Sequence, residues 1–124
     1  MRNDHPTRIL CIDDNCECLQ LMSMALRSFD MYTAMTNREG LAMAKRGGYS
    51  LFIIDYYLPD GNGAHFCRSL REFDSETPVL FVTGSDDFSD LDARSVGAQG
   101  MLRKWHFNFV DELRHQADQL TAHN

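Results

Sequence analysis

The chain has 124 residues, of which 44% are hydrophobic and 24% are charged, and its formal net charge is −6. This size and composition fit one folded domain, and the negative charge argues against direct nucleic-acid binding, which needs a basic face to neutralise phosphates. No apolar run reaches the length of a membrane span, and no signal-peptide pattern opens the chain. We therefore expect a cytoplasmic protein without membrane insertion.

The four cysteines do not predict a metal site. The spacing of Cys11, Cys16, Cys18 and Cys67 matches no zinc pattern, and each falls where a core strand or helix is expected. The five histidines are scattered along the chain. We therefore expect the cysteines to behave as small buried hydrophobic residues.

The first half of the chain predicts strands and helices in alternation. Residues 8–12 form a short apolar run typical of a buried strand, and apolar residues then recur at helical spacing as far as Phe29. Residues 31–35 predict a second strand. Residues 37–46 predict a helix, which the glycines at 47–48 end.

The most apolar strand lies in the middle of the chain. Residues 50–54 read SLFII and are expected at the centre of a sheet, because strands covered on both faces are unbroken apolar runs. Asn62 can cap the helix that follows, whose apolar residues extend from Phe66 to Phe73.

The last third of the chain continues this pattern. Residues 78–83 predict another buried strand, and residues 86–95 predict a short helix that contains Phe88 and Leu91. The final helix carries one apolar stripe, made of Val110, Leu113, Ala117 and Leu120.

Five strands thus alternate with five helices. This order predicts an α/β fold with a five-stranded, doubly wound parallel sheet that has helices on both faces. The two weaker strands, residues 31–35 and 100–104, are expected at the edges of the sheet.

Polar side chains follow the predicted strands at the point where each strand ends. Asp13 and Asp14 follow the first strand, Asp55 the third, Thr83 ends the fourth and Lys104 the fifth. Ligands of an open parallel sheet bind beyond the carboxyl ends of its strands. We therefore expect three carboxylates, a hydroxyl and an ammonium group at one rim.

Each of these residues also has an ordinary structural explanation. Asp14 or Asn15 can cap the first helix, Lys104 can protect an edge strand, and Asp55 can begin a turn. Three neighbouring carboxylates nevertheless raise one another's pKa values unless a cation lies among them. Such an oxygen-rich group favours Mg²⁺, and with a hydroxyl and an ammonium it suits phosphoryl transfer.

The segments RILCIDDN, LFIIDYYLPDGNG, PVLFVTGS and GAQGMLRKW carry a family resemblance. In order and spacing, over essentially the whole chain, they resemble the response-regulator receiver domain of two-component signalling. The resemblance implies a flavodoxin-like (βα)5 fold with strand order 2-1-3-4-5 and a single receiver domain over residues 1–124. Either a stand-alone receiver or one cut from a larger protein fits the sequence.

The resemblance also implies a role for each rim residue. Asp55 is expected to accept a phosphoryl group from a histidine of a sensor kinase or a phosphotransfer protein. Asp13 and Asp14 are expected to bind Mg²⁺, with Asp55 and the main-chain carbonyl of Tyr57 as the other protein ligands. Lys104 is expected to pair with the phosphoryl group or with unmodified Asp55.

Thr83 is expected to hydrogen-bond a phosphoryl oxygen. The resemblance implies a phosphoacceptor that is not an enzyme, beyond catalysing its own phosphorylation and dephosphorylation at Asp55. The new charge is expected to alter a protein-binding face made by the fourth helix, fifth strand and fifth helix.

Two positions depart from the family pattern. Trp105 follows Lys104 where the family usually has proline, and we predict a trans bond between them because a non-proline cis bond costs about 2.5–4 kcal/mol. Met101 stands where the family usually has an aromatic residue that moves on activation. Met101 and Trp105, beside Arg103, either mark a partner surface or pack back on the domain.

Tyr57 either shields the acyl phosphate from water or is simply a surface aromatic residue. A flavodoxin-like cofactor binder needs a phosphate-binding loop after the first strand, where this chain has DDNCE. A dehalogenase-type hydrolase needs an acidic residue at position 57. A receiver-like binding module that is never phosphorylated remains the main alternative.

Overall fold

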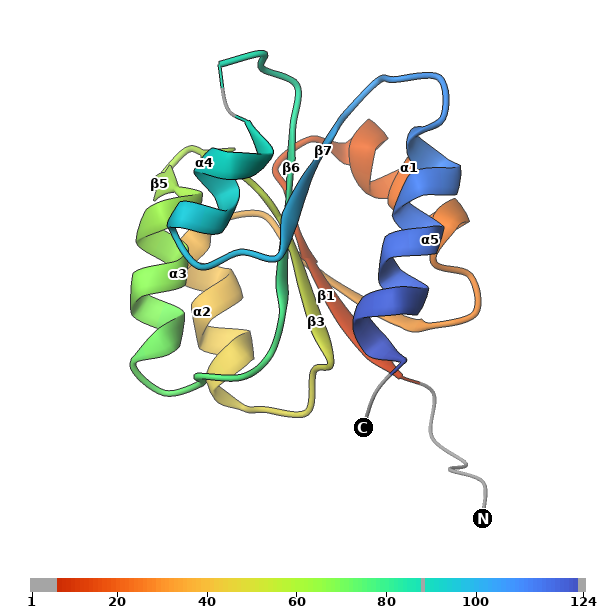
Figure 1. Ribbon diagram of the computed structural model, residues 1–124. Coiled ribbons are helices and arrows are strands. Elements are labelled where there is room, and N and C mark those ends of the chain that lie inside the picture. The colour runs from red at the N-terminus through yellow and green to blue at the C-terminus, as the bar shows by residue number, and fades with distance from the viewer. Residues whose placement is uncertain (1–6, 88, 123–124) are drawn as a thin grey trace.

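Five parallel strands form the central sheet in the computed structural model, which describes residues 7–87 and 89–122 (Figure 1). The order of the strands across the sheet is β2-β1-β3-β6-β7. This is the predicted order 2-1-3-4-5 once the two short strands β4 and β5 are set aside. The bounds of the five are Arg8–Ile12 (β1), Asp30–Ala34 (β2), Leu51–Asp55 (β3), Val79–Thr83 (β6) and Gly100–Arg103 (β7).

Helices cover both faces of the sheet, as predicted. Figure 1 shows α1 and α5 on one face and α2, α3 and α4 on the other. On each face, a layer of buried apolar side chains lies between the sheet and the helices that cover it. The helices are Cys16–Ala25 (α1), Asn37–Lys45 (α2), Gly63–Arg71 (α3), Asp90–Ser95 (α4) and Phe109–Thr121 (α5).

The central strand β3 is buried along its whole length. Its neighbours β1 and β6 pair with it in parallel, while β2 and β7 lie at the edges. The prediction that the two weaker strands are edge strands is therefore confirmed. Because β3 is covered from both sides, its last residue, Asp55, is only 7% exposed.

Side-chain caps determine where four of the helices begin. Asn15, Thr36, Asn62 and Ser89 each accept a hydrogen bond from a main-chain N–H in the first turn of α1, α2, α3 and α4, respectively. The cap predicted at Asn62 is confirmed. Of the two caps considered for the first helix, the one at Asn15 is present.

Several predicted boundaries are wrong. The first helix ends at Ala25, so Phe29 lies in the turn before β2. The fourth helix begins at Asp90 rather than at residue 86, because the side chains of Ser89 and Asp92 form a capping box that starts it there. Leu91 on this helix is 79% exposed. Phe88 lies outside the described residues.

A short hairpin between β3 and α3 was not predicted. Its strands, Tyr57–Leu58 (β4) and Gly61–Asn62 (β5), pair antiparallel directly after Asp55. Three of the cysteines are buried as expected, but Cys16 is exposed at the start of α1, so its assignment to the core is wrong. None of the helices in the described part of the chain has the length and apolar character needed to cross a bilayer.

Candidate functional site

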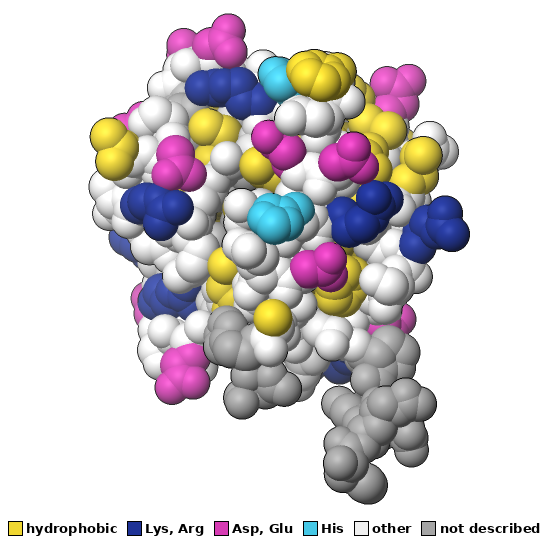
Figure 2. Space-filling view, turned by 45° about the vertical axis from the view of Figure 1, so that its right-hand side comes forward, with side chains coloured by type: hydrophobic (Ala, Val, Ile, Leu, Met, Phe, Trp, Pro, Cys, Tyr) yellow, Lys and Arg dark blue, Asp and Glu magenta, His cyan; other side chains and the backbone are white. Residues whose placement is uncertain are grey.

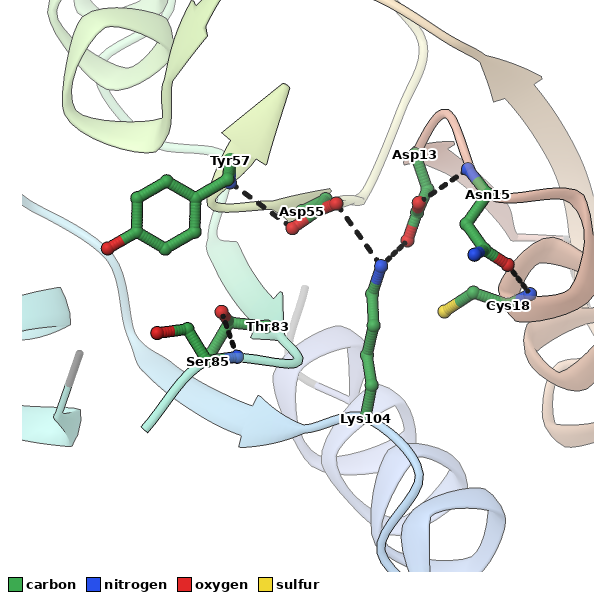
Figure 3. Close-up of polar contacts among 8 residues, drawn as sticks. All are labelled: Asp13, Asn15, Cys18, Asp55, Tyr57, Thr83, Ser85 and Lys104. Atoms are coloured by element: carbon green, nitrogen blue, oxygen red, sulfur yellow. Dashed lines mark hydrogen bonds and ion pairs between the residues drawn. The ribbon is translucent and has the colours of Figure 1, made fainter. Parts of the chain in front are cut away.

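The residues predicted at the rim come together at the carboxyl ends of the strands, and Figure 3 shows all of them except Asp14. Asp13 follows β1, Asp55 and Thr83 are the last residues of β3 and β6, and Lys104 follows β7. Asp14 lies next to Asp13 and is exposed, whereas Asp13 is fully buried. The parallel sheet therefore brings five residues from four distant segments to one place, and their chemical roles stay predictions.

Lys104 lies between two carboxylates (Figure 3). Its Nζ is 2.8 Å from Oδ2 of Asp13 and 3.1 Å from Oδ2 of Asp55, and its side chain is only 6% exposed. The contact of Lys104 with Oδ2 of Asp13 is an ion pair. The ammonium also donates a hydrogen bond to Asp55.

The pKa values of Asp55 and Lys104 reflect this arrangement. Burial is the main reason that the pKa of Asp55 lies above its ordinary value, and the charge of Asp13 adds to the effect. The Lys104 ammonium and the main-chain N–H of Tyr57 offset part of the rise. Burial acts to lower the pKa of Lys104, but its acidic neighbours, Asp13 foremost among the carboxylates, raise it overall.

Main-chain groups orient the acidic side chains. The N–H of Tyr57 donates to Oδ1 of Asp55 at 3.2 Å, and the N–H of Asn15 donates to Oδ1 of Asp13 at 2.9 Å. Each bond spans two residues, so the turn that follows each strand itself orients the carboxylate. With their Oδ1 atoms bound in this way, Asp13 and Asp55 direct their Oδ2 atoms at Lys104 (Figure 3).

Three carboxylates form a group that suits a divalent cation. One oxygen from each of Asp13, Asp14 and Asp55 lies within 4.8 Å of the other two. Three negative charges and the positive charge of Lys104 leave two negative charges. Oxygen-only ligands of this charge fit Mg²⁺ better than a softer metal.

Thr83 is buried and already has one hydrogen-bond partner. Its Oγ1 accepts the N–H of Ser85 at 3.0 Å, and the hydroxyl proton remains to be donated. Sequence reasoning missed Ser85. It named Arg103 only beside a possible partner surface, and not as a residue whose guanidinium donates to the carbonyl of Ser85. The only sequence signal for Arg103 was its place next to Lys104.

Met101 and Trp105, the two positions that depart from the family pattern, lie on either side of Arg103 and Lys104 in the chain. Met101 is partly buried and packs on the core layer beneath α2, α3 and α4. Trp105 is 52% exposed and has a φ angle of 66°, in the left-handed region. The described residues contain no cis peptide bond, so the predicted trans bond between Lys104 and Trp105 is confirmed.

Comparisons with known proteins agree with this picture. A family model described as the response regulator receiver domain matches residues 9–115. The transcriptional regulatory protein TrcR of Mycobacterium tuberculosis is 34% identical over 87 residues, which are 68% of this chain and 34% of that protein. The cell cycle transcriptional regulator CtrA of Caulobacter vibrioides is 33% identical over 82 residues, 64% of this chain and 36% of that protein.

Solved structures show the same fold. A putative response regulator from Chloroflexus aurantiacus superposes with a TM-score of 0.84 at 23% sequence identity, covering 95% of this chain and 99% of that one. The sequence relatives are longer: the chain spans only about a third of the length of these two regulators.

Proposed function

The chain belongs to the response regulator receiver domain family of two-component signalling, and from this premise we propose that Asp55 accepts a phosphoryl group from a phosphohistidine in a Mg²⁺-dependent reaction. The single observation that carries the proposal is the position of Asp55. It is a nearly buried carboxylate that shares one ammonium with a second buried carboxylate. Such an arrangement holds a nucleophile in one orientation beside a positive charge, which phosphoryl transfer needs.

The transfer forms one bond and breaks another. A carboxylate oxygen of Asp55 attacks phosphorus, and the bond between phosphorus and the donor imidazole nitrogen breaks. The imidazole nitrogen keeps the electron pair and is protonated from solvent. The product is an acyl phosphate, which water later hydrolyses to restore Asp55.

Lys104 and Thr83 stabilise the charge that the transferred group carries. The Lys104 ammonium is already 3.1 Å from Asp55 and can follow its oxygen to the phosphoryl group. The Thr83 hydroxyl has a proton to donate, because its oxygen accepts from Ser85. Groups arranged in this way need little rearrangement during the reaction.

Asp13, Asp14 and Asp55 would hold Mg²⁺, together with the main-chain carbonyl of Tyr57 that the family resemblance implies. The bound ion supplies positive charge that offsets the phosphoryl oxygens. The Lys104 ammonium by itself leaves two negative charges on the group of three carboxylates, which repels a phosphoryl donor.

The proposed partners are proteins. The donor is a sensor histidine kinase or a histidine phosphotransfer protein in the cytoplasm. The proposed downstream surface is the face made by α4, β7 and α5, where Leu91, Trp105 and Phe107 are 79%, 52% and 93% exposed. Figure 2 shows hydrophobic and acidic side chains intermixed near the top of the molecule, where the loop between β7 and α5 lies.

A hollow on this face has room for partner side chains. Its volume is about 450 Å³, and it lies between α4, β7 and the start of α5. Its lining residues are Ser89, Asp90, Met101, Leu102, Arg103, His106 and Glu112. Because β7 leads directly into Lys104, a change at Asp55 has a short route to this surface.

Intact-mass measurement after incubation with Mg²⁺ and acetyl phosphate or phosphoramidate tests the function. We expect a gain of one phosphoryl group that Asp55→Asn and removal of Mg²⁺ each abolish. Asp118→Asn, an exposed change on α5, is the matched control and should leave the gain intact. If neither donor nor any phosphohistidine protein modifies the wild type, the receiver-like binding module is the better description.

A further inference from the structure

The loop after β6 is attached to the end of β7 through Arg103. The guanidinium Nη1 of Arg103 donates to the main-chain carbonyl of Ser85 and lies 3.8 Å from Oδ1 of Asp86. Because Asp86 is 96% exposed, its ion pair contributes little. Of these two contacts, the one with the Ser85 carbonyl is therefore the one that holds the loop more firmly.

Ser85 passes this contact on to Thr83. Its N–H donates to Oγ1 of Thr83, and its own Oγ accepts the N–H of Asp87 at 3.0 Å. In each of these two turns, a side-chain hydroxyl oxygen accepts the main-chain N–H two residues later in the chain. Together the two turns fix the main chain from Thr83 to Asp87. The direction of the Thr83 hydroxyl thus depends on where Ser85 is held.

The strand register places Arg103 next to Thr83. The two residues are direct partners in the β6–β7 pairing, so their side chains lie on the same face of the sheet. The N–H of Lys104, the residue directly after β7, donates to the carbonyl of Thr83 at 2.8 Å. Arg103 and Lys104 therefore hold the end of β6 through one side-chain contact and one main-chain contact.

Trp105 adds a contact to the same loop. A Cβ atom added to Gly84 would lie 3.5 Å from the indole Nε1 of Trp105. The ring therefore packs against Gly84, the residue between Thr83 and Ser85. A left-handed φ of 66° is costly for tryptophan, and the surrounding structure must maintain it. The loop is thus held from both sides of Lys104.

We propose that Arg103 is a positioning residue for phosphoryl transfer to Asp55. By holding the carbonyl of Ser85 it fixes the N–H that orients the Thr83 hydroxyl toward the transferred group. The inference rests on the proposed function, because it assigns Arg103 a part in that reaction. Phosphoryl transfer depends mainly on positioning, so a small displacement of Thr83 slows it.

The rate of Asp55 phosphorylation by phosphoramidate in saturating Mg²⁺ tests the inference. We expect Arg103→Gln to slow the reaction about tenfold, as for the loss of one charge-assisted hydrogen bond, and Arg103→Lys to restore part of the rate. Arg94→Gln is the matched control, since Arg94 pairs only with Asp90 on the exposed side of α4 among the described residues. It should react at the wild-type rate.

A double-mutant cycle separates positioning from general stabilisation. If Arg103 acts through Thr83, Arg103→Gln has no further effect in a Thr83→Ala background. The same slowing in both backgrounds, or no slowing in either, would overturn the proposal. Urea unfolding of each variant identifies any rate loss that comes from an unfolded fraction.

Hydrogen exchange at the Ser85 amide provides a measurement that does not depend on phosphorylation. We expect faster exchange in Arg103→Gln than in Arg94→Gln, and equal exchange would overturn the contact itself. A wild-type protein that takes no phosphoryl group contradicts the proposed function and removes the catalytic role of Arg103 with it. A modified wild type with an unaffected Arg103→Gln contradicts only the positioning role.

Discussion

The ammonium of Lys104 lies closer to Asp13, at 2.8 Å, than to the proposed phosphoacceptor Asp55, at 3.1 Å. Asp13 is fully buried and Asp55 nearly so. The lysine therefore pairs with two buried carboxylates at once and is not reserved for the reaction at Asp55. Its removal affects the stability of the fold as well as the chemistry.

Lys104→Met should lower the free energy of unfolding by about 3 kcal/mol in EDTA, because it leaves buried carboxylates without a cation. Mg²⁺ should restore more stability to this variant than to the wild type, since the ion binds the folded carboxylates. Urea unfolding with and without Mg²⁺ measures both effects. Lys45→Met, at the exposed end of α2, is the control; equal stability of Lys104→Met and wild type in EDTA would contradict this account.

Tyr57→Ala should shorten the lifetime of the acyl phosphate several-fold if the ring shields it from water. The Tyr57 ring is 49% exposed and packs edge-to-face on Tyr56, with ring centroids 4.9 Å apart. The decay of the phosphorylated mass after removal of the donor measures the lifetime. Tyr57→Phe keeps the ring and should behave like wild type; the same lifetime in Tyr57→Ala means that the ring does not shield.

Thiol reagents should modify one cysteine of the folded protein quickly and all four in urea. Burial raises the pKa of Cys18 to about 12 and that of Cys67 to about 11, and it also raises the pKa of Cys11. These three stay protonated and enclosed near neutral pH, and the thiolate is the reactive form. Cys16→Ser should remove the fast phase, and a second fast thiol in the native protein would disprove the buried positions.

Asp60 should stabilise the fold in a pH-dependent way. Its carboxylate accepts the N–H groups of Asn37 and Arg38 at 2.8 and 3.0 Å, which joins the hairpin after Asp55 to the start of α2. Burial acts to raise the pKa of Asp60, but these two bonds lower it overall. The stabilisation is complete above the unfolded-state pKa of about 3.9 and is lost as pH falls through the lower folded-state value.

Asp60→Ala should therefore cost about 1 kcal/mol at pH 7, as for the loss of a helix cap. Urea unfolding at a series of pH values should show the difference from wild type shrinking in acid. Asp118→Ala, an exposed change on α5, should show no such trend. If the difference in stability between Asp60→Ala and wild type stays constant down to the lowest pH at which both fold, the carboxylate charge of Asp60 is not the cause of the stabilisation.

The sheet, and the group of polar residues at the carboxyl ends of its strands, were predictable because both depend on patterns that are visible in the sequence. An unbroken apolar run such as residues 51–54 needs cover on both faces, and parallel strands bring the residues that end them to one edge. The predicted strand, residues 50–54, begins and ends one residue before the observed β3, Leu51–Asp55, since the apolar run stops before Asp55 while the hydrogen-bonded strand includes it.

The missed features depend on contacts between segments. The start of α4 could have been found from Ser89 and Asp92, which have capping-box spacing, but the apolar side chains at 88 and 91 suggested an earlier start. Each strand of the β4–β5 hairpin has only two residues, which is too few for an alternation of apolar and polar side chains to be recognised. The contact of Arg103 with a main-chain carbonyl has no sequence pattern at all.

Replacement of Trp105 by the proline that the family usually has should destabilise this chain. Proline requires a φ near −65°, whereas residue 105 has a φ of 66° and lies against Gly84. We expect Trp105→Pro to lower the free energy of unfolding by more than about 1 kcal/mol, because an incompatible backbone costs more than the entropy proline saves. Trp105→Gly is the control, since glycine accepts the left-handed conformation. Trp105→Pro should be the less stable of the two in urea, and a proline variant as stable as wild type would show that the loop does not need this backbone.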